Sequence, residues 1–148
     1  MAASDAKSGI TGFFESYRAA FERYDAASLV DCFVYPSYIV SDAEQVVLIP
    51  MGTREDCLVG IEQVLGLHRK LGVASGRYRR FQITELSSRL ASLHLQYELH
   101  DGAGRTLYDF IGFYTLVFCE GAWRIATISH NQIPRLIDCV ARRQAATS

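Results

Sequence analysis

The chain has 148 residues, enough for one domain with a single hydrophobic core. Fifteen basic and sixteen acidic side chains leave a net charge of −1 without a concentrated basic surface, so we expect no nucleic-acid partner. No apolar run approaches the roughly 20 residues that a membrane span requires, and the N-terminal residues lack the apolar core of a secretory signal. We therefore expect a cytoplasmic protein that does not bind membranes.

The four cysteines are far apart in the sequence and form neither a CxxC motif nor a Cys/His pattern with metal-ligand spacing. Each lies in an apolar stretch, where a free thiol behaves as a small hydrophobic side chain. We expect Cys32, Cys57, Cys119 and Cys139 to be reduced and buried, and we expect neither a metal nor a cofactor.

The expected domain organisation is a flexible tail over residues 1–8, a single domain over residues 9–138 and a second flexible tail over residues 139–148. The domain begins with a helix, because apolar residues recur at helical spacing at Ile10, Phe13, Phe14, Tyr17, Phe21 and Tyr24. Asp25 is a candidate cap of a second, short helix. A third helix is predicted between Thr53 as N-cap and Gly72 as C-cap.

The remaining sequence is predicted to form strands. Two short strands fall at residues 37–41 and 45–49, and three or four long strands follow from residue 77 into the 130s. Turn signals at 102–104 and 120–121 separate the later strands.

The predicted strand over residues 107–118 is apolar on both faces, so in an antiparallel sheet it requires cover on both sides. Three helices can cover only one face. We therefore expect a homodimer in which a second copy covers the outer face of the sheet. Asp109 interrupts the apolar pattern, and a buried carboxylate there predicts an ion pair with an arginine, placed across the subunit boundary.

Three segments resemble the nuclear-transport-factor-2-like superfamily, which includes SnoaL-like and ketosteroid-isomerase-like proteins. They are SYRAAFERYDAASLVDCF, PMGTREDCLVGIEQV and EGAWRIATISHN, and in the last of them Gly121, Trp123 and Ile125 match the family's GxW-x-Ile hairpin. The resemblance covers residues 10–134. It implies an α+β, cystatin-like cone in which three helices from the N-terminal half pack on a strongly bent, mostly antiparallel sheet around a pocket. The outer sheet face of this family commonly forms a dimer.

The ketosteroid isomerases of this superfamily use an aspartate base and two acidic donors. The resemblance places the helix-one tyrosine of that pattern on Tyr17, the base on Ser41, and the protonated aspartate near Tyr114. A serine hydroxyl cannot act as that base. Asp42 can replace it only if the register shifts by one residue, which turns its side chain to the other face. Which of Ser41 and Asp42 faces the cavity stays open at this point.

Further polar candidates lie on the third helix and the last strand. His68 falls on the apolar face of the helix, where it is either a core residue or the best general base of the chain, because its unperturbed pKa is about 6.5. Alternation along the last strand, with the usual hand of the cone, places Thr127, Ser129 and Asn131 in the pocket. The same alternation points His130 toward the interface.

Two functions follow from this pattern. The first is a small-molecule-binding cone for an apolar or aromatic ligand, which can serve as a cofactor-independent isomerase, cyclase or dehydratase acting by acid–base chemistry. Its catalytic candidates are His68, Tyr17 and Asp42, and its ligand-binding candidates are Ser41, Tyr114, Thr127, Ser129 and Asn131. The second is a non-catalytic dimeric binding or interaction module with a vestigial cavity. An open, wet pocket favours the first function, and a cone filled by side chains favours the second.

Overall fold

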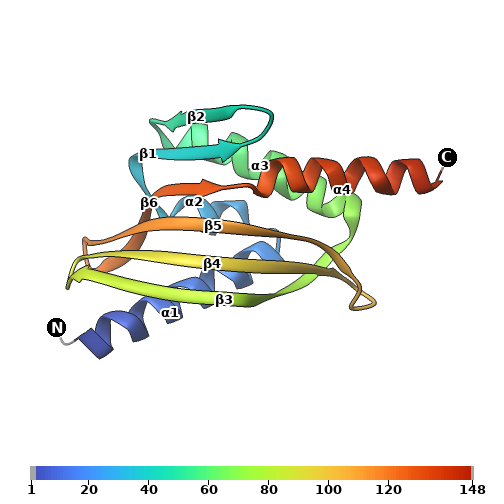
Figure 1. Ribbon diagram of the computed structural model, residues 1–148. Coiled ribbons are helices and arrows are strands. Elements are labelled where there is room, and N and C mark those ends of the chain that lie inside the picture. The colour runs from blue at the N-terminus through green and yellow to red at the C-terminus, as the bar shows by residue number, and fades with distance from the viewer. Residues whose placement is uncertain (1–2, 148) are drawn as a thin grey trace.

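The structure is a computed structural model that describes residues 3–147 (Figure 1). Its elements are α1 (Ala3–Glu22), α2 (Ala26–Val30), β1 (Phe33–Asp42), β2 (Val46–Met51), α3 (Arg54–Leu71), β3 (Val73–Ser87), β4 (Leu90–Asp101), β5 (Thr106–Cys119), β6 (Ala122–His130) and α4 (Gln132–Thr147). The strands form one six-stranded sheet in the order β2-β1-β6-β5-β4-β3. Only β1 and β6 pair in parallel among these strands. The predicted α+β fold class is confirmed. Within residues 3–147, no helix is both long and apolar enough to cross a membrane.

Helices α1, α2 and α3 lie on one side of the sheet, which we call its inner face (Figure 1). Cross-strand pairing places Leu93 opposite Tyr114 and Leu99 opposite Tyr108, so the inner faces of β4 and β5 carry large side chains. All four are at most 5% exposed. Removal of this apolar surface from water is the main force that holds the helices on the sheet.

The ends of α3 follow the predicted capping residues. Thr53 and Asp56 form a capping box, in which each side chain accepts a hydrogen bond from the backbone N–H of the other residue. Gly72 ends the helix with φ of 72°, a left-handed conformation that glycine adopts without a steric penalty. Asp25 caps α2 by accepting a hydrogen bond of 3.2 Å from the N–H of Ser28.

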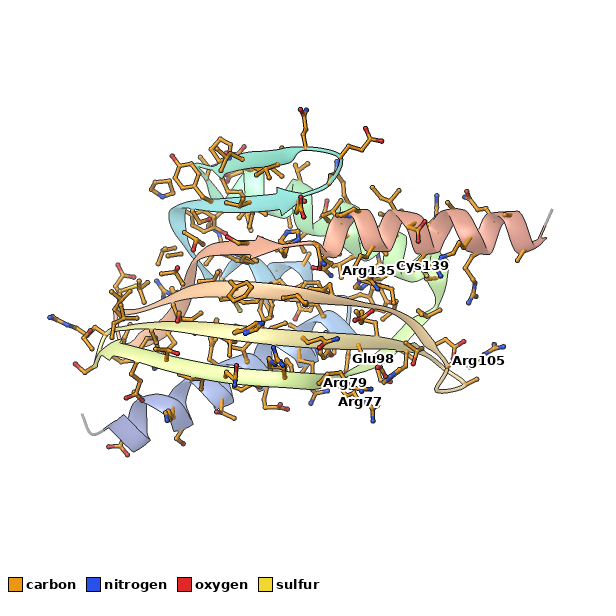
Figure 2. The ribbon with its side chains drawn as sticks, in the orientation of Figure 1. Arg77, Arg79, Glu98, Arg105, Arg135 and Cys139 are labelled. Carbon is orange, nitrogen blue, oxygen red and sulfur yellow. The ribbon has the colours of Figure 1, made fainter. Side chains whose placement is uncertain are left out.

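Both ends of the described chain are helical, within the segments 1–8 and 139–148 that were expected to be flexible tails. Helix α1 begins at Ala3, and Ala6 is buried one turn before Ile10 on the same face. Helix α4 continues to Thr147 and buries Cys139, whose thiol lies 3.2 Å from the carbonyl oxygen of Leu107 on β5 (Figure 2). Pro134 falls in the first turn of α4, where no intrahelical N–H bond is lost. Residues 1, 2 and 148 lie outside the described residues.

Asp109 has its predicted ion pair, but the arginine belongs to the same chain. Arg135 of α4 donates a hydrogen bond of 2.6 Å to the carboxylate, and Figure 2 shows Arg135 beside β5. Gln96 donates a second bond of 3.0 Å. These hydrogen bonds, that of Gln96 first, hold the pKa of Asp109 below its usual value. The pair therefore fastens α4 to the sheet.

Helix α1 approaches β6 closely at Trp123, the single tryptophan of the chain. A Cβ atom at Gly9 would lie 3.1 Å from the indole Nε1, so a side chain at this position would press on the ring. The indole is 5% exposed and packs edge-on against Phe118, with ring centroids 5.5 Å apart.

The outer face of the sheet carries exposed apolar side chains in the single chain. Phe113 of β5 is 53% exposed and Ile111 is 39% exposed, as the doubly apolar pattern of this strand indicated. The imidazole of His94 on β4 stacks on Phe113, with ring centroids 4.2 Å apart. Tyr38 and Leu48, on β1 and β2, are further exposed residues of this sheet face.

Candidate functional site

A cavity of about 80 Å³ lies between α1, α3 and the inner face of the sheet. Aromatic rings form most of its wall, and they belong to Phe14, Tyr17, Phe21, Tyr78, Tyr97, Phe110 and Tyr114. Polar groups come from His68, His130, Gln132 and Ser75. The charged side chains of the wall are Arg18 and Glu22, which bind each other at 2.8 Å. The cavity is therefore an aromatic shell with a few convergent polar atoms, as is typical of small-molecule sites.

Three of the predicted site residues line this one cavity. Tyr17 comes from α1, His68 from α3 and Tyr114 from β5. The two tyrosine hydroxyls have no hydrogen-bond partner among residues 3–147. Burial raises the pKa of both phenols, so both stay protonated at neutral pH. Each can therefore donate a hydrogen bond to a molecule in the cavity.

The position of the Tyr114 ring depends on Gly112. A Cβ atom at Gly112 would lie 2.8 Å from Cε1 of Tyr114, which is closer than such atoms can approach. Gly112 pairs with His130 on β6 and is therefore next to a second residue of the cavity wall.

His68 is fixed from behind by a buried hydrogen-bond network. Its Nε2 atom lies 2.7 Å from the hydroxyl of Tyr108, which also accepts a bond of 3.1 Å from the side-chain amide of Gln132. Because the tyrosine oxygen accepts from Gln132, we assign its own proton to His68 Nε2 and the proton of the neutral imidazole to Nδ1. Burial lowers the pKa of His68 to about 4, so the ring is neutral at pH 7.

His130 lines the same cavity in a defined tautomer. Its Nδ1 atom accepts a hydrogen bond of 3.0 Å from the backbone N–H of Gln132, the first residue of α4. Burial lowers the pKa of His130 to about 4, so in the neutral ring the proton must sit on Nε2. No partner of Nε2 exists among the described residues. His130 therefore presents an N–H donor to the cavity.

The pairing of β6 contradicts the assignment of Thr127, Ser129 and Asn131 to the pocket, which followed from alternation and the usual hand of the cone. Strand β5 pairs Thr115 with Thr127 but Leu116 with Ile125, so Ala126 is an extra residue in β6. Inward-facing positions are thus odd-numbered before Ala126 and even-numbered after it. Thr127 and Ser129 lie on the outer face opposite Thr115 and Phe113.

The prediction was therefore wrong for these residues and for His130, which faces the cavity and not the outer surface. Asn131 lies at the end of the strand, where its Oδ1 atom accepts a bond of 2.9 Å from the N–H of Ile111.

The open choice between Ser41 and Asp42 is settled by the pairing of β1. Ser41 pairs with His130 and is 5% exposed, so its side chain is buried on the inner face of the sheet. It does not belong to the wall of the cavity. Asp42 is exposed and alternates to the outer face. Its predicted catalytic position is therefore corrected, since a carboxylate there cannot reach the cavity.

The four cysteines are free thiols, but only Cys57 and Cys139 are buried, whereas Cys32 and Cys119 are half-buried. Burial raises the pKa of Cys32 to about 11 and also raises that of Cys57. Within residues 3–147, no three side chains of His, Cys, Asp or Glu are grouped so that they could hold a metal ion.

Sequence reasoning did not find Gln132, Tyr78 or Tyr97 as cavity residues. Tyr78 and Tyr97 carried a usable signal, because both are aromatic residues on strands that had to face the helices. Gln132 carried none, because its position depends on the turn of the chain between β6 and α4.

The chain belongs to the family described as NTF2-like protein (DUF6841), which matches residues 5–132. Solved structures with the same fold include Aln2 from a Streptomyces species, with 16% identity and a TM-score of 0.71 over 97% of this chain and 99% of that chain. An NTF-2 like protein of unknown function from Shewanella oneidensis has 12% identity and a TM-score of 0.69, over 85% and 98% of the two chains.

A third similar structure is a putative calcium/calmodulin dependent protein kinase II association domain from Xanthomonas campestris. It has 14% identity and a TM-score of 0.62, over 84% of this chain and 86% of that chain. No curated protein matches the sequence. At these identities the structural likeness establishes the NTF2-like, cystatin-like fold alone.

Proposed function

We propose that this protein binds a small, uncharged molecule with an oxygen acceptor in the cavity between α1, α3 and the sheet. The observation that carries the proposal is the pair of hydroxyls on the buried residues Tyr17 and Tyr114, which line the cavity without a protein partner among the described residues. Both hydroxyls are accessible from the cavity, and a ligand oxygen there would accept their hydrogen bonds. The N–H group of His130 is a third donor on the same wall.

The finer proposal is cofactor-independent acid–base chemistry on that ligand. To act as the base, His68 takes up its other neutral tautomer, in which Nε2–H donates to the Tyr108 oxygen and Nδ1 is free to accept the proton. Tyr17 and Tyr114 donate hydrogen bonds to the oxygen on which charge develops. Asp42 has no part in this proposal, because its side chain lies on the outer face. The reaction class is the shift of a proton next to a carbonyl group, which isomerases, cyclases and dehydratases share.

The test uses the short neutral ketone 2-hexanone and two kinds of measurement. Calorimetric titration should give about three- to tenfold weaker binding after Tyr17→Phe or Tyr114→Phe, because each change removes one donor. Tyr38→Phe on the outer face is the matched control and should not change the affinity. Equal affinity in all four proteins would mean that the ketone does not bind at this cavity.

Catalysis is tested separately by proton NMR of the ketone in D2O. The wild-type protein should exchange the hydrogens next to the carbonyl faster than buffer does, and His68→Gln should abolish the difference. If the ketone binds but its hydrogens exchange no faster than in buffer, the protein is a carrier of the ligand and not an enzyme acting on it.

A dimeric interaction module is the second candidate, and the exposure of Phe113 and Ile111 on the outer sheet face supports it. We propose that two copies associate through this face. Such a dimer is compatible with a ligand in the cavity, because the two lie on opposite faces of the sheet. The free thiols support a reducing, cytoplasmic environment for either function.

A further inference from the structure

A groove of about 930 Å³ lies outside the cavity, between α3 on one side and β1, β2 and the start of α4 on the other. Its wall is mainly apolar, and typical residues are Ile39, Ile49, Met51, Ile61, Leu67 and Ile137. The cavity alone is smaller than the roughly 300–1,000 Å³ of usual ligand sites, whereas the groove falls within that range.

The groove and the cavity share part of their walls. Both are lined by Tyr17, Phe21, Ile128, His130 and Gln132. Tyr17 and His130, which carry hydrogen-bond donors, therefore belong to the part of the wall that the two spaces share. A molecule that reaches these donors from the groove has its polar end in the cavity and its remaining atoms among apolar side chains.

Two glycines of α3 indicate that the groove is kept open. Gly60 and Gly66 line it, and an added Cβ atom at either position would meet no atom within 4 Å. A glycine inside a helix destabilises it by about 0.5–1 kcal/mol relative to alanine. Neither close packing nor backbone geometry requires these glycines, since both lie within the regular helix. A larger side chain at Gly60 or Gly66 would narrow the groove, which gives a physical reason for glycine at these two positions.

The polar end of such a molecule should carry no charge. The donors on the shared part of the wall are neutral groups, and the two charged side chains on the cavity wall, Arg18 and Glu22, already bind each other. A carboxylate placed among neutral donors and aromatic rings would lose its hydration without an opposite charge. A carbonyl or phenol oxygen has no such cost.

We propose that the groove and the cavity form one site for an elongated neutral amphiphile, with its carbonyl or phenol oxygen at Tyr17 and His130 and its apolar body along α3. The proposal rests on the proposed function, because it requires that the cavity accept the oxygen of the ligand. Beyond the proposed function, it specifies that the ligand is elongated and uncharged, and that its apolar body lies in the groove.

The experiment compares the binding of three probes to the full chain by calorimetry at pH 7.5. They are 2-undecanone, the shorter 2-hexanone, and undecanoate, which has the same number of carbons as the first but carries a charge. We expect affinity to rise about fourfold for each methylene that enters the groove, so 2-undecanone should bind about a hundredfold or more tightly than 2-hexanone. Undecanoate should bind at least about tenfold more weakly than 2-undecanone.

Filling the groove provides the matched variants. Gly66→Leu should weaken 2-undecanone at least about tenfold and leave 2-hexanone within about twofold, because only the apolar body is displaced. Gly60→Leu is a second variant with the same expectation. Gly12→Leu on α1 is the control, since Gly12 is exposed, has open space around its Cβ position, and lines neither space. Circular dichroism establishes that each variant is folded.

The outcomes separate this inference from the proposed function. If 2-hexanone binds and 2-undecanone binds no more tightly, the cavity is a ligand site and the groove is not. The inference about the groove is then overturned, while the proposed function stands. If neither ketone binds, both proposals fail. If Gly66→Leu changes the molecular mass in light scattering while ketone affinity is unchanged, the groove is a contact between copies of the chain and the inference is overturned.

Discussion

The imidazole Nε2 of His68 and the hydroxyl of Tyr108 are 2.7 Å apart, although the residues are 40 positions apart in the sequence. The bond joins α3 to β5 inside the core, where His68 is 1% exposed and Tyr108 is 3% exposed. Gln132 extends it to α4 through its own bond to the tyrosine oxygen. One phenol thus joins three elements of the fold.

Tyr108→Phe should lower the free energy of unfolding by about 1–3 kcal/mol, because it leaves the buried Nε2 atom of His68 and the half-buried amide of Gln132 without their partner. Urea denaturation followed by circular dichroism measures the change. Tyr38→Phe is the matched control, because Tyr38 is 50% exposed and its hydroxyl can bond to water. A Tyr108→Phe protein as stable as the control would show that the network does not contribute to stability.

Stability should decrease as the pH falls from about 6.5 to about 4. Burial lowers the folded-state pKa of His68 and His130 to about 4, whereas the unfolded chain binds these protons near pH 6.5. The unfolded state therefore binds more protons across this window, so the stability is fully present above it and is lost on acidification. Each histidine should account for about 3 kcal/mol by pH 4.

Denaturant titrations at several pH values check this dependence. His68→Gln is expected to be less stable at pH 7.5, yet its stability should fall less steeply between pH 6.5 and 4. An unchanged slope in both His68→Gln and His130→Gln would mean that neither histidine is held neutral in the folded protein.

Phe113→Asp should convert a dimer into a monomer. In the proposed dimer this side chain is at the apolar part of the outer sheet face, and an unpaired carboxylate buried in the interface is strongly unfavourable. Light scattering of the wild-type protein should give about twice the chain mass of 16.5 kDa, with more than roughly 1,000 Å² of surface buried. Leu86→Asp, an equally drastic change at an exposed residue near the end of β3, should leave the mass unchanged. A wild-type monomer at micromolar concentration would contradict the dimer.

Thiol labelling of the native protein should be slow. Cys57 and Cys139 are buried, and the raised pKa of Cys32 leaves little thiolate at neutral pH. A chromogenic disulfide reagent should label all four thiols rapidly only after denaturation. Rapid labelling of Cys57 or Cys139 in the folded state would show that the helices covering them open readily.

The elements that the sequence predicted correctly are those set by neighbouring residues. The ends of α3 follow from Thr53 and Gly72, since a cap needs only the local chain. The apolar spacing of α1 places Tyr17 on the sheet for the same reason. Helix α4 was missed because the sequence after residue 140 is mostly polar and shows no clear helical spacing of apolar residues. In the structure the helix is fixed by the buried residues Leu136 and Cys139, and the Cys139 thiol contacts β5.

The site residues that the sequence placed wrongly depend on pairing between strands. Alternation from Trp123 and Ile125 continues correctly only as far as the bulge at Ala126, and one extra residue then exchanges the two faces. Nothing in the residues of β6 themselves marks that position. The alternation over residues 127–131 was predicted correctly, but the usual hand of the cone assigned its two faces the wrong way round, and His130 was therefore placed on the outer side.

The position of Trp123 decides which spectroscopic signal can follow this protein. The indole lies where α1 meets β6, packed beside Gly9 and Phe118, and it lines neither the cavity nor the groove. Because the chain has only this tryptophan, its fluorescence should report the detachment of the first helix and remain silent when a ligand enters. Emission from the same fluorophore can then serve as an internal standard for folding while a separate method records occupancy.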